Sequence, residues 1–156
     1  MTDRTVDFSR TEHVEILTQS TLNGYKRLFG GKLMEWIDIV AAVVARRHSG
    51  KNVTTAYIDS LTFTAPAYAN ETIVLKGYIT YAGRTSMEIC VKTYVETLDN
   101  DLNLINTAYV IMVALDDNEK PTKIPKLILT NDCEKSEWQA ALKRKELRKL
   151  RKNEEY

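Results

Sequence analysis

The sequence has few cysteines, few histidines and almost no net charge. Cys90 and Cys133 are its only cysteines and form no Cys-x-x-Cys motif, so we expect two structural thiols and no disulfide framework. His13 and His48 are too few and too scattered for a metal site. The formal net charge is +1, which gives no global reason to expect a nucleic-acid or membrane partner.

Long apolar runs are also missing. The longest wholly apolar run, residues 39–45, is far too short to cross a bilayer. The opening residues, MTDRTVDFSRTEH, contain no apolar signal region. With 156 residues and 44% hydrophobic side chains, the chain is long enough for one domain with a real core. We therefore expect a cytoplasmic globular protein with free thiols.

Residues 23–50, NGYKRLFGGKLMEWIDIVAAVVARRHSG, predict a glycine-rich loop that opens a long helix. Apolar side chains follow the helical i, i+3, i+4, i+7 spacing, and the other faces are largely apolar too, so we expect surrounding structure to wrap this helix. Basic residues followed by Ser49-Gly50 are typical of a helix end. Asp38 is the only acid between Trp36 and Ala45, where a carboxylate needs a partner or a function.

The remaining chain predicts a sheet and a second helix. We expect residues 1–10 to form a loose, polar N-terminal lead without regular structure, and residues 12–20 to form a first strand. After Gly50 the apolar period changes to two, which predicts strands at 53–64, 72–81, 86–96 and 104–115. The strand at 86–96 alternates between a buried and a wetter face, and the last strand is expected to be covered on both sides. Residues 119–132 indicate an extended surface segment, and 134–152 a helix. Short connections favour antiparallel neighbours, hence a two-layer α+β domain.

An ordered set of motifs makes this pattern specific: NGYKRLFGGKLMEWID, ARRH, VTTAYID, FTAP, GRTSME and VALD. Together they resemble the hotdog-fold acyl-CoA thioesterases, the small bacterial acyl-CoA hydrolases and the brain-type hydrolases of animals. The resemblance implies a hotdog fold, with an antiparallel sheet wrapped around one long central helix. A single domain then spans 1–156, with its core at about 12–130 and a helical tail at 134–152. Lys26 departs from the family, which often has glycine there.

The resemblance also implies an activity and an assembly. The activity is hydrolysis of acyl-CoA to free fatty acid and coenzyme A, with no metal or redox cofactor. The assembly is a homodimer that pairs sheets edge to edge, often grouped into a hexamer as a trimer of dimers, with active sites between subunits. One alternative is a non-catalytic acyl-CoA-binding sensor or regulatory subunit on the same fold. Another is a hotdog dehydratase, although no family-like His-Asp hydratase pair is found around the helix.

Thioester hydrolysis needs an activated water and stabilisation of the oxyanion. The resemblance makes Asp38 the catalytic acid, either general base or nucleophile; the alternative is a structural, hydrogen-bonded aspartate. It matches Asn23 to the catalytic asparagine, which alone would be an ordinary loop residue. Gly30 and Gly31 sit where a helix N-terminus could hold the thioester oxygen; the alternative is a tight turn with positive φ.

Coenzyme A carries phosphates, and the chain offers basic candidates for them. Arg84, Thr85 and Ser86 lie at a predicted hairpin turn, which is otherwise a plain exposed turn. Arg46 and Arg47 could also reach phosphates, or only complement the helix end.

The tail KRKELRKLRK, residues 143–152, has seven basic residues and one acid. A solvated helix face, or a helix laid on a neighbouring subunit, is favoured over nucleic-acid binding because no aromatics are interleaved.

Overall fold

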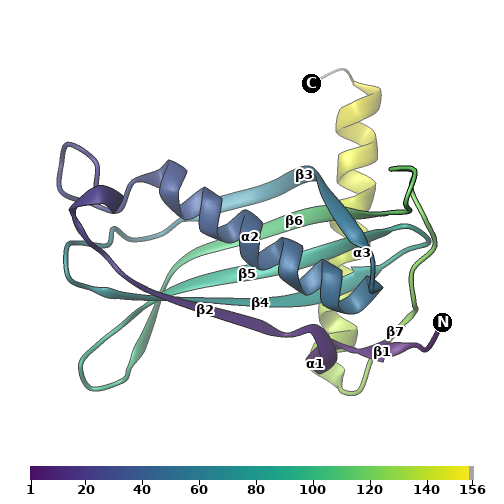
Figure 1. The fold of residues 1–156 in the computed structure, drawn as a ribbon, viewed down its shortest axis with the longest axis horizontal. Coiled ribbons are helices and arrows are strands. Elements are labelled where there is room, and N and C mark those ends of the chain that lie inside the picture. The colour runs from purple at the N-terminus through teal and green to yellow at the C-terminus, as the bar shows by residue number, and fades with distance from the viewer. Residues whose placement is uncertain (155–156) are drawn as a thin grey trace.

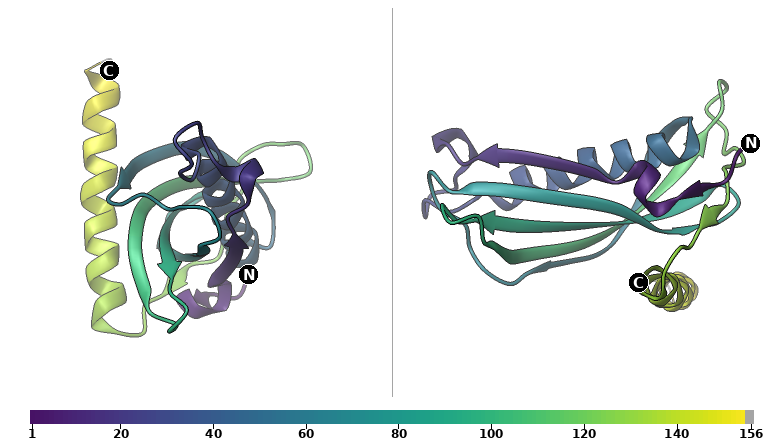
Figure 2. Two further views of the ribbon diagram at one scale, coloured as in Figure 1. Left: turned by 90° about the vertical axis from the view of Figure 1, so that its left-hand side faces the viewer. Right: turned by 90° about the horizontal axis from the view of Figure 1, so that it is seen from below.

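The computed structural model describes residues 1–154. A 20-residue helix, α2 (Gly30–Ser49), lies along the concave side of a five-stranded antiparallel sheet (Figure 1). The sheet is formed by β2 (Thr11–Ile16), β3 (Asn52–Phe63), β4 (Thr72–Ala82), β5 (Ser86–Glu96) and β6 (Leu102–Leu115). The long helix α3 (Asp132–Asn153) crosses the other side of the sheet (Figure 2). These layers are the predicted hotdog arrangement, which is confirmed.

One face of α2 fills the core. Leu33, Ile37 and Val44 are fully buried against the sheet. The helix ends at Gly50 as predicted: its φ of 67° is left-handed, and its N–H donates to the Arg46 carbonyl at 2.8 Å.

The opposite face of α2 is open, contrary to the expectation that structure would wrap the helix all round. Met34 is 40% exposed and Ile39 51% exposed. The reason is that the curved sheet lies on one side of the helix only, so apolar side chains such as Met34 and Ile39 on the other side stay exposed in this chain.

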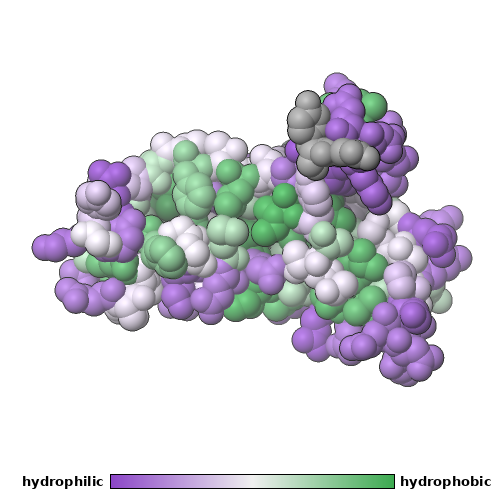
Figure 3. Space-filling model, turned by 90° about the horizontal axis from the view of Figure 1, so that it is seen from above, coloured by the Kyte–Doolittle hydropathy of each residue, from purple (hydrophilic) through white to green (hydrophobic). Residues whose placement is uncertain are grey.

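The sheet order is β2-β4-β5-β6-β3, so β2 and β3 are its edges. Strand β3 pairs only with β6, and its register skips one residue at Ala56 and again at Asp59. Exposed apolar side chains on this strand and on α2 include Tyr57, Phe63 and Ile39. Figure 3 shows the resulting band of apolar surface across this side of the molecule. The outer edge of this long apolar strand has no partner strand, so its backbone N–H and C=O groups can pair with another chain.

Three segments differ from their predictions. The N-terminal lead is ordered, with β1 (Arg4–Thr5), a short helix α1 (Val6–Ser9), and β1 paired to β7 (Leu127–Ile128). The first strand ends at Ile16 and is followed by a 3-10 turn, η1 (Gln19–Thr21). The segment 119–132 is also not purely superficial, because Ile124 is buried. Pairing between residues far apart in sequence produces these features, which local patterns cannot reveal.

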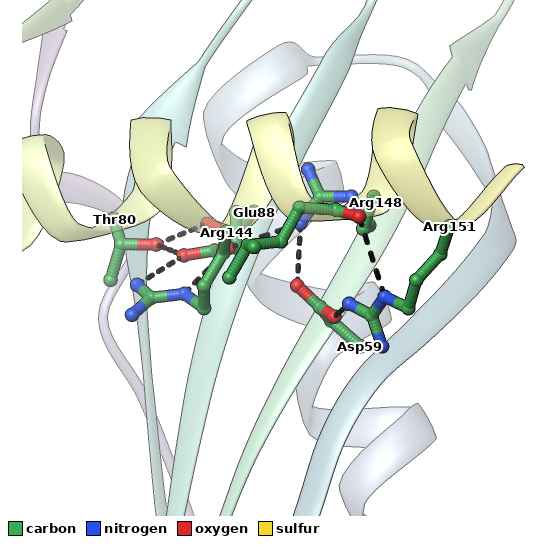
Figure 4. A network of polar contacts seen from close by, with 7 residues as sticks. Asp59, Thr80, Glu88, Arg144, Arg148 and Arg151 are labelled. Atoms are coloured by element: carbon green, nitrogen blue, oxygen red, sulfur yellow. Dashed lines mark hydrogen bonds and ion pairs between the residues drawn. The ribbon is translucent and has the colours of Figure 1, made fainter. Parts of the chain in front are cut away.

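On the face of β5 that was predicted to be wetter, Glu88 lies under α3 and is buried in an ionic network (Figure 4). Glu88 is 1% exposed and accepts hydrogen bonds from the Arg144 guanidinium at 2.8 and 3.0 Å, and from Thr80 Oγ1 at 2.6 Å. Asp59, on β3, is likewise buried and accepts from Arg148 at 2.7 Å and Arg151 at 2.6 Å. The prediction of a wetter face is therefore wrong at Glu88, whereas Lys92 and Glu96 on the same face are partly exposed as predicted.

This network accounts for much of the basic tail. Three of its basic side chains pair with two buried carboxylates of the same chain. Helix α3 therefore lies on its own sheet, rather than only on a neighbour, and Trp138 packs on Tyr81 with 4.4 Å between ring centroids. A buried ion pair is costly to break from one side, because the remaining charge stays desolvated.

We predict that Glu88→Ala lowers the free energy of unfolding by about 3–5 kcal/mol, because it leaves the Arg144 guanidinium buried without its carboxylate. Urea unfolding at fixed protein concentration measures the change. The matched control is Glu146→Ala, which removes an exposed carboxylate 3.9 Å from Lys149 on the same helix and should cost less than about 1 kcal/mol. Equal effects of the two substitutions would show that α3 is not pinned by this network.

Candidate active site

The Asp38 carboxylate lies on the open side of α2, facing the edge strand β3. It is half-buried, and its Oδ1 accepts a hydrogen bond from Thr55 Oγ1 at 2.6 Å. Thr55 therefore fixes one carboxylate oxygen and leaves the other available. Sequence reasoning quoted the motif that contains Thr55 but gave that residue no role, because only the fold brings β3 beside the helix.

Asn23 organises the loop before α2. Its side-chain Oδ1 accepts from the N–H groups of Tyr25 at 2.9 Å and Arg27 at 3.2 Å. Its own N–H donates to the Arg27 carbonyl at 2.8 Å. Within residues 1–154 the side-chain Nδ2 has no hydrogen-bond partner in this chain. The loop thus holds the amide by its oxygen and presents the nitrogen as a donor.

Lys26 sits in this loop with φ of 60°, in the left-handed region that favours glycine. This explains why glycine suits the position in the resembled family. For an L-residue the conformation costs roughly 1–2 kcal/mol. The backbone of the Asn23 loop is therefore held in place by its hydrogen bonds despite that cost.

Gly30 and Gly31 form the first turn of α2, after Phe29, whose side chain makes no capping hydrogen bond. The first N–H groups of the helix are thus left without a side-chain cap. Gly50, not these residues, is the glycine with positive φ, so the alternative of a positive-φ turn is wrong. A Cβ at position 31 would lie 2.6 Å from the Phe29 ring, so a larger residue there would require this exposed ring to move.

Within one chain Asn23 and Asp38 do not meet. Asp38 is eight residues beyond Gly30, roughly 12 Å further along the helix axis. A pocket of about 330 Å³ next to Asn23 is lined by Leu33, Phe63 and Pro66 among others, but not by Asp38. A single chain therefore presents the two predicted catalytic groups at separate places.

The predicted phosphate-binding residues lie in the turn between β4 and β5. The carbonyl of Arg84 accepts from the Ile124 N–H at 3.0 Å, and that of Thr85 accepts from the Ala114 N–H at 2.9 Å. Ser86 begins β5, and its carbonyl accepts from the Gly83 N–H at 2.8 Å. The turn is thus firmly anchored, and the Arg84 side chain is exposed.

The two arginines at the end of α2 differ. Arg47 donates to the Arg10 carbonyl at 3.1 Å and to Thr11 Oγ1 at 3.0 Å, which ties α2 to the start of β2. Arg46 is exposed and lines a pocket of about 440 Å³ with Lys51, Asp116 and Asp117. The two carboxylates make that pocket less suited to an anion.

His48 is buried, and its Nε2 lies 2.9 Å from the Pro125 carbonyl. Burial lowers the pKa of His48, so the ring is neutral at pH 7. Across residues 1–154 no three His, Cys, Asp or Glu side chains are grouped to hold a metal ion.

The comparisons with known proteins agree with this geometry. Residues 25–99 match the family model of the thioesterase superfamily. The chain is 37% identical over 131 residues to the uncharacterized acyl-CoA thioester hydrolase YkhA of Bacillus subtilis, covering 83% of this chain and 76% of that protein. The chain belongs to the acyl-CoA thioesterase family. The relatives that show this are named as enzymes, acyl-CoA thioester hydrolases.

Solved structures of acyl-CoA thioesterases share the whole fold. An acyl-CoA hydrolase from Staphylococcus aureus, in complex with butyryl coenzyme A, coenzyme A and coenzyme A disulfide, superposes with a TM-score of 0.91 at 32% identity, over 97% of this chain and 93% of that one. A hexameric acyl-CoA thioesterase in its apo form gives 0.92 at 34% identity, over 97% of both chains. Further structures of the S. aureus enzyme carry an aspartate, an asparagine or a threonine replaced by alanine. Within the described part of this chain, no helix is long and apolar enough to cross a membrane.

The two cysteines of this thioesterase differ sharply. Cys90 is fully buried under α3, and burial raises the pKa of its thiol to about 11. Burial also raises the pKa of the neighbouring Tyr109 to about 12. Cys133 is exposed in the first turn of α3, so its thiol is not part of the core.

We predict that Ellman's reagent at pH 8 modifies one thiol per native chain quickly and the second only after denaturation. With a pKa of about 11 and no access to solvent, Cys90 is a protonated, shielded thiol at this pH. Cys133→Ser should abolish the fast reaction and leave the slow one. Two fast thiols in the native protein would contradict the packing of α3 over Cys90.

Proposed function

We propose that this chain hydrolyses acyl-CoA to a free fatty acid and coenzyme A, with Asp38 acting on the water or directly on the thioester. The observation that carries the proposal is the hydrogen bond of 2.6 Å from Thr55 to Asp38, at the open face of α2. It orients a carboxylate toward the surface where another chain would lie. A carboxylate fixed in this way can accept a proton from water or attack the acyl carbon.

Stabilisation of the oxyanion falls to donors that have no hydrogen-bond partner among residues 1–154. The Nδ2 group of Asn23 and the uncapped N–H groups at Gly30 and Gly31 are such donors, at the positive end of the α2 dipole. Thus Asn23 and the helix N-terminus bind the thioester oxygen, and Asp38 supplies the base or nucleophile.

These two parts come together when two chains pair along β3. In one chain they are well separated, whereas a two-fold axis beside β3 would turn the Asn23 end of one α2 toward Asp38 of the partner. The apolar band along β3 supports such a dimer. The hexameric relative at 34% identity supports assembly of dimers into a hexamer, which we propose is a trimer of dimers.

The direct test follows release of free thiol from short- and long-chain acyl-CoA. We predict turnover by the wild-type chain and a loss of about a hundred- to ten-thousand-fold in kcat for Asp38→Asn, because the amide cannot act as a base. Coenzyme A binding by the variant should be unchanged, as measured by calorimetry. Binding without turnover in the wild type would instead identify a non-catalytic acyl-CoA sensor, and near wild-type kcat in the variant would make Asp38 structural.

Sharing of the site between chains has its own test, using Asn23→Asp and Asp38→Asn. The first substitution keeps an acceptor for the Tyr25 and Arg27 N–H groups but removes the Nδ2 donor, so the loop is preserved. Each variant alone should be inactive. When the two chains are co-expressed and pair at random, about one site in four collects both intact groups, so about a quarter of wild-type activity should return.

The control for this experiment is the double variant co-expressed with wild type, which separates restored sites from dilution. If verified mixed assemblies are no more active than the separate variants, Asn23 and Asp38 do not meet across chains and the shared-site model is wrong.

A further inference from the structure

Helix α3 crosses the outer face of the sheet strand by strand and runs past its edge (Figure 1). Its side chains contact β4, β5 and β3 in turn, through the pairs Trp138–Tyr81, Arg144–Glu88 and Arg148–Asp59. From Arg148 the helix continues to Asn153, which adds roughly 7–8 Å. A strand paired to the free edge of β3 would lie about 4.8 Å away. The end of α3 therefore overhangs the position of such a strand.

The C-terminal half of α3, residues 143–153, has an uncovered apolar side. Leu147 is 55% exposed and Leu150 54% exposed, although both are large apolar side chains. They line a cavity of about 520 Å³ between α3 and the outer face of the sheet, together with Ser60 and Tyr109. Lysines line a different pocket on the opposite side of the helix, namely Lys145, Lys149 and Lys152. The leucine side is therefore suited to an apolar surface, and the lysine side to water.

The position of a second β3 follows from the proposed shared site, on which this inference rests. On β3, Thr55 lies beside Asp38. Further along the same strand, Phe63 lines the pocket next to Asn23. Bringing the partner's Asn23 loop to Asp38 with the two β3 strands antiparallel therefore sets the partner's Phe63 opposite Thr55. The two-fold axis then passes halfway between these positions, close to Asp59.

Asp59 lies beneath the C-terminal half of α3, which binds it through Arg148 and Arg151. A surface that lies over a two-fold axis meets its own copy across that axis. Two copies of α3 would therefore run side by side in opposite directions, over the seam between the two β3 strands. Contact through the lysine side would bring like charges together, whereas contact through the leucine side buries apolar surface. The occupant that fits the leucine side is thus the same side of a second copy.

The side chains match when the two helices run in opposite directions about a midpoint near Arg148. Leu147 of one chain then lies against the partner's Leu150, and Glu154 lies beside the partner's Lys143. Lys143 is four residues before Leu147 and Glu154 four residues after Leu150, so both charges flank the leucine side. Both are exposed, and within residues 1–154 neither forms an ion pair. An apolar centre with a charged rim is typical of protein interfaces.

We propose that the leucine side of α3 is an interface with a second copy of this chain, in which Leu147 and the partner's Leu150 pack across the two-fold axis. The contact adds a second layer to the proposed β3 pairing. A slip of the paired strands by two residues would shift one chain by about 6–7 Å and separate these leucines. The α3 contact therefore fixes the register in which Asn23 and the partner's Asp38 meet.

The experiment crosslinks two copies of α3 with a short bismaleimide. Chains with Leu147→Cys and chains with Leu150→Cys are co-expressed with different affinity tags. Every chain also carries Cys133→Ser, which removes the exposed native thiol. Crosslinked dimers that carry both tags should form in this mixture. The matched control is a mixture of Lys145→Cys and Lys149→Cys chains, whose thiols lie on the opposite side of the helix and should not crosslink.

A second measurement follows dissociation of the assembly on dilution, by sedimentation velocity. In Leu147→Glu/Leu150→Glu the concentration at which the assembly dissociates should rise more than about a hundredfold, because carboxylates replace the apolar centre of the contact. The control Leu98→Glu/Leu102→Glu changes two exposed leucines at the β5–β6 turn and should shift it less than about twofold.

The outcomes separate this contact from the proposed function. Restored activity of mixed Asn23→Asp and Asp38→Asn chains without a crosslink through the leucine side would overturn the α3 contact alone. Equal crosslinking in the lysine control would overturn it as well. If no crosslink forms and palmitate binds the wild type but not Leu147→Glu/Leu150→Glu, the cavity holds an apolar ligand instead of a second copy. A crosslink in a chain that hydrolyses no acyl-CoA would reject the proposed function and leave the contact standing.

Discussion

Close packing of one apolar helix into one curved sheet is the constraint on which this structure depends. The contact is tight enough that β4 needs a glycine beneath the helix: a Cβ at Gly77 would lie 2.6 Å from the Val40 side chain. Because a single sheet covers only one side of a helix, the other side of α2 remains open along β3. The residue that breaks the apolar pattern, Asp38, lies on that side. The incomplete burial of α2 thus creates both the candidate active site and the apolar surface for a second chain.

On the outer side of the sheet, α3 is held by ion pairs rather than by apolar packing alone. There α3 is not an apolar helix, and its buried face carries arginines that meet Glu88 and Asp59. Such pairs add little net stability compared with apolar packing, but a helix with misplaced arginines would leave charges buried and unpaired. The network therefore contributes more to fixing the position of α3 on the sheet than to the free energy of folding. That placement also brings Trp138 beside the β4–β5 turn.

Local patterns in the sequence were sufficient for much of this architecture. Apolar side chains with a period of 3.6 residues, and the glycine at the helix end, predicted α2 almost to the residue. Apolar side chains with a period of two predicted the four strands after it. The same rules failed at Glu88, because a charged residue in an alternating strand is normally solvated, and its arginine partner is 56 positions away. Thr55 was missed for a related reason. Nothing in the sequence distinguishes it from other strand threonines, and only the fold places it beside Asp38.

Assembly follows from where the parts lie along α2. The Asn23 loop is at its N-terminal end, and the buried His48 is at its C-terminal end. The two ends are roughly 30 Å apart in a helix of 20 residues, with Asp38 between them. A two-fold axis beside β3 would reverse the direction of the partner helix, and the proposed dimer uses this reversal to bring the partner's N-terminal donors toward Asp38. In the proposed dimer, one chain would supply the carboxylate of a site and the other would supply the donors that stabilise the oxyanion.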